Sequence, residues 1–167
     1  KALELNAERL ALMAARGATA LELARYSMND SGPLIRLKRY DKAGNLLAAC
    51  RDVFERERYV EGLGMVFNAL ADLVSELGQR DQAISFGETA IRYFYLLGNP
   101  ERISICHNNF AVYLAKIGSK SALDHRLAAG SIFFQIGSSM LASSLIGLAG
   151  DFHRFGPESL PESFNQL

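Results

Sequence analysis

One pattern of residues recurs along the chain at steps of 38 to 40 positions, and this repeat restricts the possible fold more than any other feature. Residues 83–98 align with residues 122–137 at an offset of 39, and residues 43–58 lie 40 positions before the first of these. Small side chains coincide at two positions of the three stretches: Ala43 and Cys50, Ala83 and Ala90, Ala122 and Ala129. The spacing predicts three copies of one helix.

A second type of helix lies between these copies. Residues 67–78 match residues 107–118 at an offset of 40, and residues 145–156 follow 38 positions later. Apolar residues recur at helical spacings of three and four, and every copy ends at a glycine, the residue suited to a left-handed C-cap. Helices of about 15 to 18 residues are too short to be stable alone, so neighbouring helices must stabilise them. The sequence therefore predicts an all-α stacked solenoid.

The residues around each glycine turn resemble the tetratricopeptide repeat (TPR). A Leu-Ala or Phe-Ala pair lies in the middle of one helix, a glycine ends it, and two alanines seven positions apart mark the next helix. The residues that carry this resemblance are Leu70, Ala71, Gly78, Ala83 and Ala90, then Phe110, Ala111, Gly118, Ala122 and Ala129. The period exceeds the family's usual length of about 34 residues. Asn108, Asn109 and the Phe-Ala pair after them resemble the Asn-Asn-Leu-Ala signature of the longer, kinesin-light-chain-like repeats.

This resemblance implies a right-handed superhelix of antiparallel helix pairs, whose concave groove is lined by the first helix of each unit and binds peptides. Residues that flank the Leu-Ala or Phe-Ala pair are expected to face that groove. They are Met65, Asn68, Asp72 and Ser75, then Ile105, Asn108, Asn109, Val112 and Lys116, then Ile146, His153 and Arg154.

Asn68 and Asn108 occupy equivalent positions in successive units. A primary amide offers two donors and an acceptor, so a ladder of asparagines can bind the backbone of an extended peptide. The alternative is that these side chains are merely solvated or bind the neighbouring unit. Because Lys116 and Arg154 are the only basic groove candidates, we do not expect a receptor for C-terminal carboxylates.

Outside the repeats, the sequence predicts three further segments. Residues 1–28 read as a helix pair around Gly17, and residues 29–41 as an irregular insertion, because Asn29 to Pro33 form a run of helix breakers. A short strand pair at residues 34–37 is the alternative. The repeats then occupy residues 42–156, and residues 157–167 read as the start of a further helix or a truncated tail. Both ends suggest a piece of a longer protein.

Composition and motifs argue against several functional classes. Eighteen basic and eighteen acidic residues give no net charge, which disfavours nucleic-acid binding. Cys50 and Cys106 lie in apolar helical patterns, and the three histidines lack a metal-ligand spacing, so we expect no metal, no cofactor and a cytoplasmic location. Catalytic motifs are absent from the sequence, and we expect no enzyme.

Residues 127–150 carry no charge. Their serines, and the break at Gly137, favour two buried helices over a membrane span. The expected function is that of a scaffold that binds a protein or peptide, within a larger regulatory protein. The alternative is self-association, as a homodimer through the apolar C-terminal helices, or the sensor domain of a signalling protein.

Overall fold

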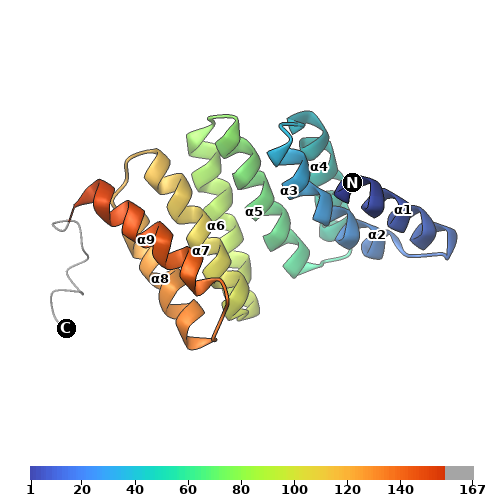
Figure 1. Cartoon of the computed structure of the whole chain (residues 1–167). Coiled ribbons are helices and arrows are strands. Elements are labelled where there is room, and N and C mark those ends of the chain that lie inside the picture. Colours follow the sequence, from blue (N-terminus) through green and yellow to red (C-terminus); the bar gives the residue numbers. More distant parts are fainter. Residues whose placement is uncertain (157–167) are drawn as a thin grey trace. The chain divides into compact units, whose positions relative to one another are not determined.

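The structure, a computed structural model, describes residues 1–156 and contains helices but no strand in that range. The helices shown in Figure 1 are α1 (Ala2–Ala15), α2 (Ala20–Ser27), the 3-10 turn η1 (Met28–Asp30), α3 (Ser31–Arg36), α4 (Tyr40–Arg56), α5 (Val60–Glu76), α6 (Arg80–Leu97), α7 (Pro100–Lys116), α8 (Ala122–Gln135) and α9 (Leu141–Phe155). Consecutive long helices are joined by tight turns, as the all-α repeat prediction requires.

Two compact units divide the chain, one of residues 1–93 and one that begins at Phe94. In the first unit, α4 packs on α5, and α2 and α3 pack on α4. In the second unit, α7 packs on α8, and α8 packs on α9. Each unit is thus built from helix hairpins, and the fold class is an all-α helical-repeat solenoid.

The small residues that define the repeat are buried. Each of them is at most 3% exposed to solvent: Ala43, Cys50, Ala83, Ala90, Ala122 and Ala129. A second close approach occurs at Gly62, where an added Cβ would lie 2.6 Å from the ring of Phe54. Small side chains at these positions let neighbouring side chains and helices come close, which maximises dispersion contacts in the core.

The turns between helices share one backbone geometry. Gly78, Gly98, Gly118 and Gly137 have φ between 61° and 78°, in the left-handed region. Lys38 and Arg58 hold the equivalent place in the turns before α4 and before α5, with φ of 56° and 52°. The residue after the left-handed one donates its N–H to a carbonyl five positions back, for example Tyr59 to Phe54 at 2.8 Å and Gln79 to Val74 at 2.9 Å. This is the bond that closes a Schellman C-cap.

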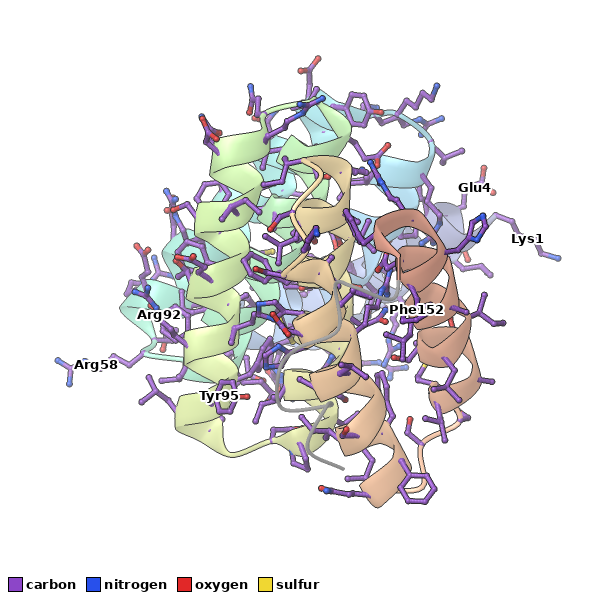
Figure 2. The ribbon with its side chains drawn as sticks, turned by 90° about the vertical axis from the view of Figure 1, so that its left-hand side faces the viewer. Lys1, Glu4, Arg58, Arg92, Tyr95 and Phe152 are labelled. Carbon is purple, nitrogen blue, oxygen red and sulfur yellow. The ribbon has the colours of Figure 1, made fainter. Side chains whose placement is uncertain are left out.

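Arg58→Gly is expected to raise the free energy of unfolding by about 0.5–1 kcal/mol, because glycine adopts a left-handed φ without the steric cost that Cβ imposes. The Arg58 side chain is exposed and extends away from the ribbon in Figure 2. Urea unfolding measures the change, and Gly78→Ala, the reverse substitution, should destabilise the chain. A decrease in stability of Arg58→Gly would contradict this view of the turns.

The prediction of an irregular insertion at residues 29–41 is wrong for most of that segment. Residues 28–36 form η1 and α3, α4 begins at Tyr40, and the alternative strand pair at residues 34–37 is also wrong. Pro33 is the third residue of α3, where a backbone N–H has no partner within a helix, so proline costs little there. Leu34 and Ile35 are buried, and their burial stabilises the helix.

The uncharged stretch at residues 127–150 is divided between α8 and α9 by the turn at Gly137. Within residues 1–156, no helix combines the length and the apolar character that crossing a bilayer requires. The predicted helix start or tail at residues 157–167 lies outside the described residues.

Candidate functional site

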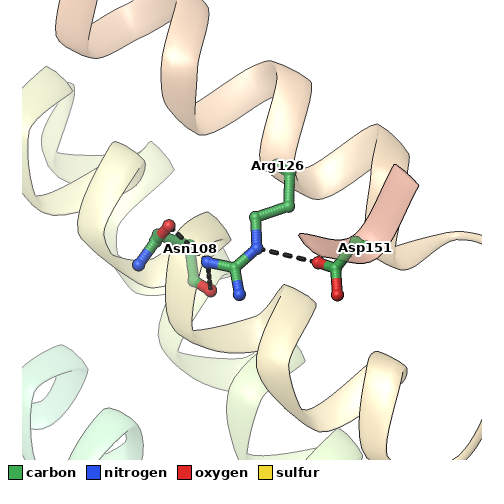
Figure 3. A network of polar contacts seen from close by, with 3 residues as sticks. All are labelled: Asn108, Arg126 and Asp151. Carbon is green, nitrogen blue, oxygen red and sulfur yellow. Dashed lines mark hydrogen bonds and ion pairs between the residues drawn. The ribbon is translucent and has the colours of Figure 1, made fainter. Parts of the chain in front are cut away.

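A network of polar side chains joins three helices of the second unit (Figure 3). Arg126 of α8 donates from Nε to Asp151 Oδ2 of α9 at 2.9 Å. Its Nη1 donates to Asn108 of α7 twice, to the side-chain Oδ1 at 2.6 Å and to the backbone carbonyl at 3.2 Å. We call these three residues the Arg126 network.

The Arg126 network is largely withdrawn from water. Arg126 and Asp151 are each 8% exposed. Gly147 of α9 makes room for the guanidinium, since a Cβ there would lie 2.7 Å from its central carbon. Desolvating two charges is costly, and the cost is offset only when the pair has good geometry and additional hydrogen bonds. Here the ion pair and the two bonds to Asn108 meet that condition, and they hold α7, α8 and α9 in register.

Asn108 is one of the predicted groove residues, and the structure gives its amide a defined orientation. A guanidinium can only donate, so the amide oxygen must face Arg126. The Nδ2 group of Asn108 then remains as a donor, with no protein partner among the described residues. Asn108 therefore hydrogen-bonds α8, the next helix along the chain, and keeps two N–H groups that can donate to a ligand.

A second polar contact joins α7 and α8 through the residues that immediately precede Asn108 and Arg126. His107 Nδ1 of α7 is 2.7 Å from His125 Nδ1 of α8, and the Tyr95 hydroxyl is 2.9 Å from His107 Nε2. Burial, and then the charge of His125, lower the pKa of His107 to about 4, and burial lowers the pKa of His125. One proton between the two Nδ1 atoms makes a hydrogen bond, whereas a proton on each would make them clash.

The histidine pair does not form a metal site. Zinc lies about 2.0–2.1 Å from each imidazole nitrogen in tetrahedral sites, which requires the two nitrogens to stand farther apart than these do. In the described part of the chain, no group of three or more His, Cys, Asp or Glu side chains is arranged to hold a metal ion.

The remaining predicted groove residues lie on α5, α7 and α9. On α5 of the first unit, all four are half-buried: Met65, Asn68, Asp72 and Ser75. On α7, three are half-buried and one is exposed: Ile105, Asn109, Val112 and Lys116. On α9, all three are exposed: Ile146, His153 and Arg154. Of the whole set, the structure brings Asn108 into the Arg126 network.

Arg126 and Asp151 were not predicted as site residues, although the sequence contains a signal for them. They are the two charges that bound the uncharged stretch 127–150. Charged side chains next to long apolar segments tend to be buried only when they are paired. Whether Arg126 and Asp151 pair depends on how α8 is aligned with α9, and the repeat pattern in the sequence does not determine that alignment.

Ser144 of α9 is buried at 1% exposure, and its hydroxyl has no hydrogen-bond partner in the described structure. Replacing Ser144 with alanine should raise the free energy of unfolding by about 1 kcal/mol, because it removes an unpaired buried hydroxyl. Ser143, its exposed neighbour, supplies the control, since Ser143→Ala should leave the unfolding midpoint in urea unchanged. A destabilised Ser144→Ala chain would show that the hydroxyl makes a bond in solution.

Comparison with known proteins identifies the class of fold. No family model matches the chain, and no curated protein matches it at a significant level. The solved structure of BtubC (BKLC) from P. vanneervenii is similar, with a TM-score of 0.54 and 17% sequence identity. The match covers 82% of this chain and 66% of that chain. The likeness shows a TPR-like helical-repeat fold.

Proposed function

We propose that the chain is a protein-interaction module that binds an extended peptide along the α7 and α9 faces of its second unit. It would catalyse no reaction and would serve as a scaffold within a longer regulatory protein. Its repeats would be the long-period, kinesin-light-chain-like variant of the TPR. The observation that carries the proposal is the fixed orientation of Asn108, whose Oδ1 accepts from Arg126 and whose NH2 group has no protein partner among the described residues. A donor held rigidly costs little entropy when it binds a peptide carbonyl.

The predicted α5 residues of the first unit, Met65, Asn68, Asp72 and Ser75, are proposed as a separate contact face of that unit. Their half-buried positions leave part of each side chain accessible. A cytoplasmic location is part of the same proposal, and so is the absence of a nucleic-acid or membrane partner.

The test uses peptides selected from a random display library on the intact chain. Asn108→Asp keeps an oxygen for Arg126 but removes the NH2 donor. We expect affinity for the selected peptides to fall about fivefold, which corresponds to one hydrogen bond of about 1 kcal/mol. Asn45→Asp, at an exposed position of α4, adds the same charge elsewhere and should change nothing. Equal affinity of Asn108→Asp and the unmodified chain would refute the proposed donor.

A second candidate function is self-association. Ile146 and Leu145 of α9 are 75% and 49% exposed, which makes an apolar strip on the last described helix. Light scattering over a concentration series tests it: a dimer that Ile146→Lys dissociates would establish the strip as an interface between copies. A chain that stays monomeric at all concentrations would exclude self-association.

A further inference from the structure

The Arg126 network leaves two polar atoms unused. Arg126 Nη2 and Asp151 Oδ1 have no hydrogen-bond partner among the described residues. The fully enclosed, unpartnered side-chain nitrogen and oxygen atoms in that part of the chain are Arg51 Nε and Ser144 Oγ, so Nη2 and Oδ1 reach solvent. In Figure 3 both point to the same side, away from the dashed contacts.

The two atoms present a donor beside an acceptor, on side chains that are only 10% and 12% exposed. The pair has no net charge, so it attracts neither anions nor cations as such. A carboxylate would meet repulsion from Asp151, and an ammonium would meet repulsion from Arg126. A neutral group with one acceptor and one donor satisfies both atoms.

The backbone N–H and C=O of one residue in an extended peptide form such a group. In an extended strand the N–H and C=O of the same residue point to the same side, which is how paired antiparallel residues exchange two hydrogen bonds. Nη2 can donate to that carbonyl, and Oδ1 can accept from that N–H. Proline lacks the N–H and satisfies only half of the pair.

We propose that Arg126 Nη2 and Asp151 Oδ1 form a binding subsite for the backbone of one non-proline residue of an extended peptide. The subsite rests on the proposed function and adds two residues that were not predicted as site residues. It recognises backbone and not side chain, so it fixes the register of the peptide while leaving its sequence open. The Nδ2 group of Asn108, on the same network, can donate to a carbonyl two residues along the peptide, which points to the same side of an extended strand.

The test uses small probes in place of an unidentified partner. N-acetylalanine N-methylamide has the N–H and C=O of one residue, and N-acetylproline N-methylamide lacks that N–H. Each is titrated into the nitrogen-labelled chain while the NMR signals of the Arg126 guanidinium are followed. We expect a saturable shift with the alanine compound, at least fivefold larger than that with the proline compound at equal concentration. Acetate and methylammonium serve as charged controls.

Three outcomes are decisive. Absence of a saturable shift, equal shifts with the alanine and proline compounds, or a larger shift with acetate would each overturn the subsite. Asp151→Asn supplies a second check: its amide retains an oxygen for Arg126 Nε but turns an NH2 group toward the ligand, so the preference for alanine over proline should disappear. A preference that survives in Asp151→Asn would also overturn the proposal.

The same measurements separate this subsite from the proposed function. If library peptides bind in an Asn108-dependent way but do not move the Arg126 signals, the subsite fails and the peptide-binding function stands. If Arg126 distinguishes alanine from proline but no library peptide binds, the subsite stands and the proposed function fails.

Discussion

Arg126→Ala is expected to lower the free energy of unfolding by about 3–5 kcal/mol, the usual cost of removing one partner of a buried ion pair. The substitution leaves Asp151 at 8% exposure without its cation and removes both bonds to Asn108. The energy is lost because a buried, uncompensated carboxylate is poorly solvated, and not because the pair contributes a large net stabilisation. Urea unfolding followed by circular dichroism measures the change.

The double variant Arg126→Met with Asp151→Leu distinguishes these two causes. Replacing both charges by apolar side chains removes the ion pair without leaving a charge behind, and such exchanges are often close to neutral. The double variant should therefore be more stable than Arg126→Ala. A loss below about 1 kcal/mol for Arg126→Ala would place the pair in the range of an exposed salt bridge and contradict its burial.

Acidification is expected to destabilise the second unit through the histidine pair. The pKa of His107 is lowered by burial and by His125 to about 4 in the folded chain, against an ordinary value of 6.5. The unfolded chain binds the proton of His107 more readily than the folded chain does. The stabilisation that depends on neutral His107 is therefore fully present above about pH 6.5 and is lost as the pH falls from there toward 4. Solvent at the half-buried His125 ring screens part of this effect. We therefore expect acidification from pH 7 to pH 4 to lower the free energy of unfolding by about 2 kcal/mol through His107.

His107→Gln tests this assignment, since glutamine cannot titrate. Unfolding curves recorded between pH 7 and pH 4 should show a smaller loss of stability for this variant than for the unmodified chain. His153→Gln, which removes an exposed histidine of α9, should retain the full pH dependence. The assignment would be wrong if His107→Gln and the unmodified chain lost stability in parallel.

The sequence predicted the parts of the fold that depend on local pattern. Small residues at positions such as Ala83 and Ala122 are buried as the repeat requires, and the glycine turns adopt the left-handed geometry expected of C-caps. The segment around Pro33 was predicted incorrectly, because Pro33 lies in the first turn of α3, where a helix tolerates proline. Burial of Leu34 and Ile35 then outweighs the local propensity.

The site was predicted less completely than the fold. Asn108 was found because a family signature includes it, but its partner Arg126 lies 18 positions away on α8, and the partner of Arg126, Asp151, lies a further 25 positions away on α9. The pairs His107 with His125 and Asn108 with Arg126 share the same separation of 18 residues, which reflects one alignment of α7 against α8. Inserting or deleting one residue in the turn between α7 and α8 would separate both pairs, and the sequence alone does not determine that alignment.

Hydrogen exchange of the backbone amides, measured with and without a library-selected peptide, tests whether the α7 and α9 faces bind that peptide. Peptide binding is expected to slow exchange in α7 and α9, with the largest effect around Asn108 and Asp151. Slower exchange confined to the turns at Gly98 and Gly137, or exchange that the peptide leaves unchanged throughout α7 and α9, would contradict it.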